Sequence, residues 1–126
     1  MGLDTYASRS PGDIELTDQD RRAFEAAGVD LCGGIYSGND GSFRGEVYWS
    51  VVLEVTGVSL TNEWLAPEIV REMAEKLNAI APETLAETND SLQVESHGKT
   101  NVEETASLQC FFALCANRNL GLIGWF

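Results

Sequence analysis

The feature that most constrains this chain is an apolar stripe between two prolines, Pro67 and Pro82. Proline suits the first turn of a helix and breaks a helix interior, so the two prolines delimit a helix over 67–80. Within this helix, apolar side chains recur every three or four positions: Ile69, Met73, Leu77 and Ile80. A helix with one apolar face buries that face against other elements. The chain therefore folds around a core, for which 126 residues with 44% hydrophobic content are sufficient.

Capping residues mark a second helix nearer the N-terminus. Thr17 and Asp20 have the spacing of a capping box, with aspartate in place of the more common glutamate. Gly28 is a typical residue at the C-terminal end of a helix. The pattern predicts a helix over 18–27.

The segment over 43–56 fits two patterns. Its alternating apolar residues, among them Trp49 and Leu53, are typical of a strand, yet the valines and aromatic residues also fall on one helical face. We predict a helix over 43–56 because Ser42 is a suitable cap and Gly57 a suitable stop. The β-branched valines favour a strand over 46–56, which stays the alternative.

The C-terminal third combines a polar stretch with an apolar helix. Residues 81–101 hold many turn-forming residues and predict a long connection, with a short strand at 92–94. A helix is expected over 102–117. It should be central in the fold because apolar side chains surround it, including Leu108, Phe111, Phe112 and Cys115. Arg118 is expected beside the carbonyl groups at the C-terminal end of this helix.

The two terminal segments are predicted to form strands. Residues 3–7 alternate between apolar and polar, and residues 122–126 are almost entirely apolar. These two segments can pair into a small sheet. The predicted fold class is therefore α+β, with one globular domain over 1–126 in which about four helices pack on a small sheet built from the terminal segments.

The charge balance limits the partners of the protein. Eight Lys and Arg residues against twenty Asp and Glu residues give a net charge of −12. Such a surface repels phosphate backbones and anionic membranes, so we expect no nucleic-acid or membrane partner. A protein partner or a second copy of the chain stays open. No apolar run is long enough to cross a membrane, and a cytoplasmic location is expected.

Metal and cofactor sites find little support in the sequence. Three cysteines without close pairing do not predict a disulfide framework or a zinc site, and His97 is the only histidine. We therefore expect neither a metal nor a cofactor. A reactive Cys32 or a catalytic His97 would depend on neighbours that the fold alone can supply.

The glycine-rich loop over 33–45 is the segment with the strongest functional character. Closely spaced glycines let a ligand approach the backbone, and the start of the following helix would add donors for a small anion. In that interpretation Ser42 and Arg44 bind the anion, Tyr36 lines the site and Asp40 is an acid or base. The alternative is a tight connection in which Arg44 pairs with a carboxylate.

Aromatic residues offer a surface for recognition. Trp49 falls off the main apolar face of its predicted helix and Trp64 lies in a polar connection, so both are expected to be exposed anchors. Trp125 and Phe126 end the chain within an apolar segment. These four residues are the candidate interface.

Short segments spread over much of the chain resemble those of known proteins. They are Met-Gly-Leu-Asp-Thr-Tyr at 1–6, Leu-Cys-Gly-Gly at 31–34, Ser-Phe-Arg-Gly at 42–45 and the segment at 57–65. In these segments the chain is similar to small bacterial and phage-associated hypothetical proteins that open with Met-Gly-Leu-Asp-x-Tyr. The resemblance implies no activity, cofactor or site residue.

The sequence thus favours binding over catalysis. We expect a non-enzymatic, acidic, cytoplasmic domain that binds a protein partner or assembles with itself through its exposed aromatic surface. The alternative is a small-molecule or anion-binding protein, or an enzyme, that uses the glycine-rich loop over 33–45.

Overall fold

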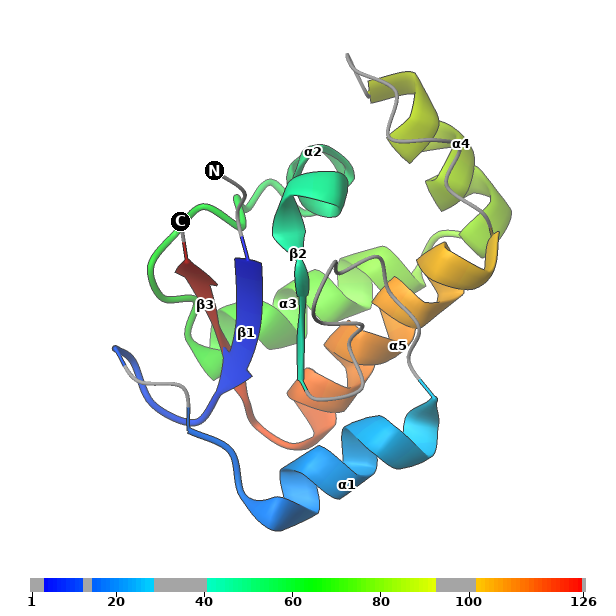
Figure 1. The fold of residues 1–126 in the computed structure, drawn as a ribbon. Coiled ribbons are helices and arrows are strands. Elements are labelled where there is room, and N and C mark those ends of the chain that lie inside the picture. The colour runs from blue at the N-terminus through cyan, green and yellow to red at the C-terminus, as the bar shows by residue number, and fades with distance from the viewer. Residues whose placement is uncertain (1–3, 13–14, 29–40, 93–101, 126) are drawn as a thin grey trace.

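The computed structural model describes residues 4–12, 15–28, 41–92 and 102–125, in which five helices pack with a three-stranded sheet (Figure 1). The elements follow in the order β1 (Asp4–Ser8), α1 (Asp18–Ala27), β2 (Ser42–Arg44), α2 (Gly45–Thr56), α3 (Pro67–Asn78), α4 (Pro82–Leu92), α5 (Val102–Asn117) and β3 (Gly121–Trp125). The α+β class is confirmed, and the structure has one more helix than the sequence predicts.

The sheet joins the two ends of the chain. β1 is the central strand, with β2 and β3 antiparallel on either side, and Asp4 lies opposite both Arg44 and Trp125. The predicted pairing of the terminal segments is confirmed.

β2 is a strand that the sequence did not predict. Gly41, with a φ of 87°, turns the chain into this strand, and Phe43 then buries its ring 4.9 Å from that of Phe111. The following helix therefore begins at Gly45 instead of residue 43, and Ser42 lies in a strand instead of capping the helix. The helical interpretation of 46–56 is confirmed.

The outer edge of β3 is covered by the connection between α2 and α3. Leu65 and Leu122 exchange two backbone hydrogen bonds of 2.8 and 3.0 Å, and the Gly124 N–H donates to the Asn62 carbonyl at 3.1 Å. This approach is so close that a side-chain carbon at residue 124 would collide with the backbone carbonyls of Leu60 and Asn62. Glycine at this position therefore allows the edge of the sheet to be closed.

Helix α5 lies at the centre of the helical layer, beside α3, α4 and α1 (Figure 1). Its predicted apolar face is buried. The core draws on every helix and on the sheet, and its largest members are Phe24, Phe43, Tyr48, Leu60, Met73, Leu77, Leu85, Leu108, Phe111, Phe112, Leu120 and Leu122.

The buried face of α3 is rotated from the predicted stripe. Met73 and Leu77 are buried as expected, but Ile69 is 38% exposed. The helix ends at Asn78, and Ile80 packs partly buried against the core from the segment that follows. Val70 and Ala74 complete the buried face instead. Residues at 70, 73, 74 and 77 also follow helical spacing, so the apolar pattern alone was compatible with either face.

Helix α4 contradicts the predicted connection over 81–101, because residues 82–92 form a regular helix. Pro82 occupies its first position and Glu83 its first turn, which suits a helix start. Leu85, Ala86 and Asn89 are buried where α4 packs against α5 and α2. Leu92 belongs to this helix, so the predicted strand does not begin there, and residues 93–94 lie outside the described residues. Tertiary packing overrides the turn tendency of Asn89 and its neighbours.

Thr5 in β1 gives a first prediction. Its hydroxyl is buried and has no hydrogen-bond partner among the described residues. Thr5→Val keeps the shape, removes the unsatisfied group and should raise the free energy of unfolding by about 1 kcal/mol. The matched control is Thr56→Val, because the buried Thr56 hydroxyl donates to the Val52 carbonyl at 2.6 Å and its loss should destabilise. Urea denaturation checks both, and a destabilised Thr5→Val protein would contradict the prediction.

Candidate functional site

The exposed apolar face of α2 is the first candidate site. Trp49 and Leu53 lie one helical turn apart and are each 40% exposed, which confirms the predicted exposure of Trp49. The opposite side of α2 is buried through Tyr48, Val51 and Val52. We call Trp49 and Leu53 the α2 face.

A hydrogen bond fixes the orientation of the α2 face. The Tyr48 hydroxyl donates to Glu104 Oε2 in the first turn of α5 at 2.9 Å. At the other end of α2, Lys76 of α3 donates to the Thr56 carbonyl at 3.3 Å. Its positive charge there interacts favourably with the negative end of the α2 dipole. Because α2 is held at both ends, Trp49 and Leu53 are presented on a fixed support.

The other three aromatic candidates are placed differently. Trp64 is half-buried instead of exposed, because its ring lies against Gly121, where a side-chain carbon would collide with it. Trp125 belongs to β3, but its side chain lies outside the described part of the structure, as does all of Phe126. Their interface roles stay predictions.

The candidate ligand residues of the glycine-rich loop are only partly described. Tyr36 and Asp40 lie outside the described residues, as do Cys32 and His97. Ser42 is buried in β2, and the register places Arg44 opposite Asp4 in the neighbouring strand. The Arg44 side chain lies outside the described part of the structure, so its pairing with a carboxylate stays a prediction. Ligand binding by these four residues stays a prediction.

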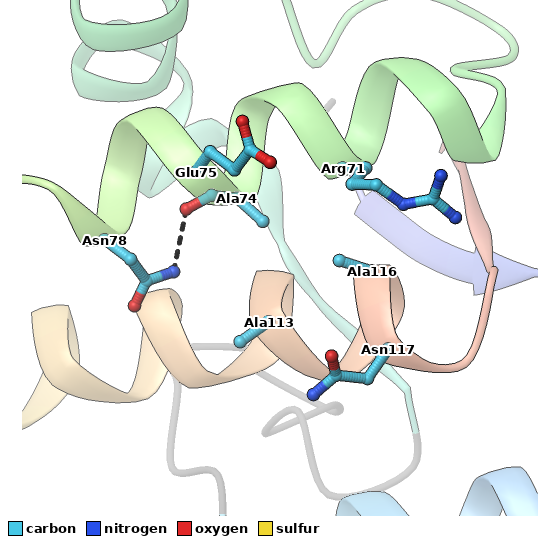
Figure 2. A pocket seen from close by; sticks show the side chains of 7 residues that line it. All are labelled: Arg71, Ala74, Glu75, Asn78, Ala113, Ala116 and Asn117. Carbon is cyan, nitrogen blue, oxygen red and sulfur yellow. Dashed lines mark hydrogen bonds between the residues drawn. The ribbon is translucent and has the colours of Figure 1, made fainter.

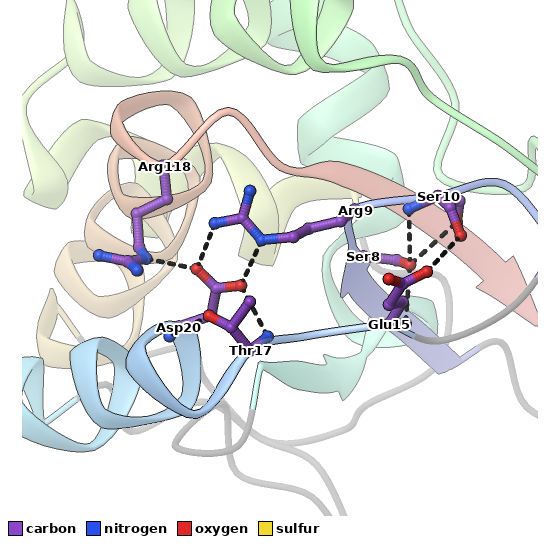
Figure 3. Close-up of polar contacts among 7 residues, drawn as sticks. All are labelled: Ser8, Arg9, Ser10, Glu15, Thr17, Asp20 and Arg118. Carbon is purple, nitrogen blue, oxygen red and sulfur yellow. Dashed lines mark hydrogen bonds and ion pairs between the residues drawn. The ribbon is translucent and has the colours of Figure 1, made fainter.

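The most prominent charged cluster surrounds Asp20 at the start of α1 (Figure 3). Arg9 donates to both carboxylate oxygens, each at 2.7 Å, and Arg118 donates from Nε to Oδ1 at 2.6 Å. The Thr17 N–H donates to Oδ2 at 2.9 Å, which completes the predicted capping box. We call these four residues the Asp20 cluster. It ties the end of β1, the start of α1 and the end of α5 together.

The hydrogen bonds decide the ionisation state of Asp20. Burial of the carboxylate would by itself raise its pKa, but the bonds from Arg9, Thr17 and Arg118 outweigh burial and hold the pKa well below its usual range. Asp20 is therefore ionised at neutral pH. With no exposed surface and both oxygens bonded, it serves structure instead of proton transfer.

The sequence revealed only part of the Asp20 cluster. The cap between Thr17 and Asp20 follows from their spacing, but Arg118 is 98 residues away and was expected beside carbonyls of its own helix. No local signal connects Arg118 to Asp20.

Cys115 in α5 is fully buried. Burial, and to a smaller extent the negative charge of Asp20, raise the pKa of the Cys115 thiol far above its usual range. The thiol is therefore protonated at neutral pH and unsuited to nucleophilic attack. Among the residues described, no three His, Cys, Asp or Glu side chains gather as a metal ion would require.

A shallow groove of about 390 Å³ runs between α3 and α5 (Figure 2). Its floor is formed by three alanines, Ala74, Ala113 and Ala116, and its polar rim by Arg71, Glu75, Asn78 and Asn117. Asn78 is engaged with carbonyl groups of Ala74 and Gln109, at 2.8 and 3.3 Å. We call this feature the α3–α5 groove.

None of the described helices has the length and apolar character needed to span a membrane. No protein-family model matches the chain, and no curated protein or solved structure matches it significantly.

Proposed function

We propose that the protein is a non-enzymatic interaction domain that binds a protein partner through the α2 face. The observation that carries this proposal is the exposure of Trp49 and Leu53, side by side on a helix whose opposite side is locked into the core. Tryptophan is enriched among residues that dominate binding energy, because it buries a large area at small entropic cost.

The chemistry of the described residues supports binding over catalysis. The Asp20 carboxylate is fully occupied by arginines and a backbone N–H, and the Cys115 thiol is buried and protonated. Both groups therefore contribute to stability instead of reactivity.

The net negative charge of the chain favours a cationic partner. At −12, the protein attracts cationic surfaces and accelerates association with them at low salt. A partner with a basic rim around an apolar pocket would match both the charge and the α2 face.

The proposal predicts that Trp49→Gln together with Leu53→Gln abolishes partner binding. Each side chain is 40% exposed, so the change should lower the free energy of unfolding by only about 1–3 kcal/mol and leave the domain folded. We would capture partners from an extract of the source cells, identify those retained stoichiometrically, and measure Kd with each purified partner by calorimetry. The Kd should rise at least about tenfold.

The matched control is Glu54→Gln, an exposed residue of the same helix outside the α2 face. It should retain the partner at nearly unchanged affinity in moderate salt. Equal affinity of the double variant and the wild type for every purified partner would refute the proposed site.

A further inference from the structure

The α3–α5 groove has the composition of a close helix-packing surface. Its floor of Ala74, Ala113 and Ala116 carries no side chain longer than a methyl group. Small side chains allow helices to approach at the short end of the usual interaxial distance of about 8–10 Å.

The rim of the groove contains one cationic and one anionic residue, and both belong to α3. Arg71 and Glu75 lie one turn apart on α3, the spacing at which opposite charges often pair within a helix (Figure 2). Within the described part of the chain no ion pair joins them. Arg71 instead donates a 3.2 Å hydrogen bond to Asn119, and both charged residues are exposed.

Helices α3 and α5 run antiparallel along the groove. Asn78 near the end of α3 reaches the Gln109 carbonyl in the middle of α5, whereas Arg71 near the start of α3 lines the groove together with Asn117 at the end of α5. The midpoint between Arg71 and Glu75 thus lies level with the stretch between Ala113 and Ala116.

We propose that the α3–α5 groove is the contact surface for a second copy of this chain. A two-fold axis that lies in the plane of the interface, level with that midpoint and running across both helices, places Arg71 of each copy against Glu75 of the other. The same axis sets Ala113 of each copy against Ala116 of the other on α5. A self-complementary surface of this kind is what a two-fold dimer requires, because one patch must supply both partners of every contact.

The net charge of the chain favours the α3–α5 groove over other faces as the contact surface between two copies. Two copies at −12 repel each other, so a dimer forms most readily where the facing surfaces are locally neutral and complementary. The charged side chains lining the α3–α5 groove are one arginine and one glutamate. The inference goes beyond the proposed partner binding, because it uses a surface separate from the α2 face.

Charge reversal tests the inference on the full chain. Sedimentation equilibrium across a concentration series should show a dimer for the wild type. Arg71→Glu or Glu75→Arg should each weaken dimerisation at least about tenfold, because each change brings like charges together twice per dimer. The double variant carrying both changes restores the crossed pairs at the wild-type net charge, and its dimerisation constant should return to within about threefold of the wild type.

The matched control is Glu72→Arg, which makes the same change in net charge as Glu75→Arg at an exposed position of α3 that does not line the groove. It should not weaken the dimer, and thermal melts should show that all four variants fold. A wild type that stays monomeric up to about 1 mM, a double variant as weak as the singles, or a Glu72→Arg effect equal to that of Glu75→Arg would each overturn the inference.

The α2 face provides the test that separates the two proposals. Trp49→Gln with Leu53→Gln should leave the dimer intact while removing partner binding. Loss of the dimer in this variant, with Arg71→Glu unaffected, would refute the groove as the contact surface and would assign self-assembly to the α2 face.

Discussion

Leu77→Asp is expected to leave the protein unfolded at ordinary temperature. Leu77 is fully buried on the face of α3 that packs against the core. The change removes a large apolar side chain, which typically costs about 2–5 kcal/mol, and introduces a carboxylate with no cationic partner, which costs several more. Domains of this kind have a free energy of unfolding of only about 5–15 kcal/mol. Circular dichroism at increasing temperature measures the outcome.

The control for Leu77→Asp lies on the same helix. Ile69 was part of the predicted apolar stripe, but it is 38% exposed in the first turn of α3. Ile69→Asp should therefore leave the protein folded and lower the free energy of unfolding by only about 1–2 kcal/mol, since an acidic residue at a helix N-terminus partly offsets the lost apolar burial. A cooperative melt for Leu77→Asp, or an unfolded Ile69→Asp protein, would show that the face of α3 is assigned wrongly.

Asp20→Asn should lower the free energy of unfolding by about 3 kcal/mol at neutral pH. The change leaves Arg9 and Arg118 without their shared counter-ion and weakens the cap of α1. The side chains of these arginines are 36% and 27% exposed, so water compensates them in part and the loss falls at the low end for buried pairs. Asp18→Asn, an exposed residue in the same helical turn, is the control and should cost a few tenths of a kcal/mol.

The pH dependence of this difference tests the ionisation of Asp20. The folded state holds the pKa of Asp20 below its unfolded value of about 3.9, so the unfolded chain binds more protons as the pH falls. The stabilisation from Asp20 is therefore fully present above about pH 5 and is lost progressively as the pH falls below 4. The gap between wild type and Asp20→Asn, measured by denaturation at a series of pH values, should narrow in that acidic range. A gap that widens with acid would contradict the assignment.

Local signals in the sequence were enough for most helices and for the terminal sheet. The cap at Thr17, the stop at Gly28 and Pro67 at the start of α3 act through neighbouring backbone groups, so their effects can be predicted from a few residues. The pairing of β1 with β3 followed from their apolar, strand-forming composition. Helix α4 was missed because Asn89, a turn-forming residue in isolation, is buried by contacts with other helices.

Contacts between residues far apart in the sequence limited how much of the candidate sites could be predicted. The exposure of Trp49 was predictable from its place on the helix, whereas Trp64 is half-buried because it meets a glycine 57 positions away in sequence. The Asp20 cluster and the α3–α5 groove likewise form only when separate elements meet. Both depend on how the helices are placed against one another in space, and a single sequence does not specify that placement.

The order of synthesis determines when the sheet can close. β1 leaves the ribosome before β2 and β3, and β3 is made more than a hundred residues after it. Until β3 emerges, β2 is the one described strand with which β1 can pair, and the connection before α3 has no β3 edge to cover. Helices can form as they are made, since their hydrogen bonds are local, but closure of the sheet waits for the final strand. A chain interrupted before Gly121 would thus expose an open sheet edge, which makes it a target for proteases and chaperones.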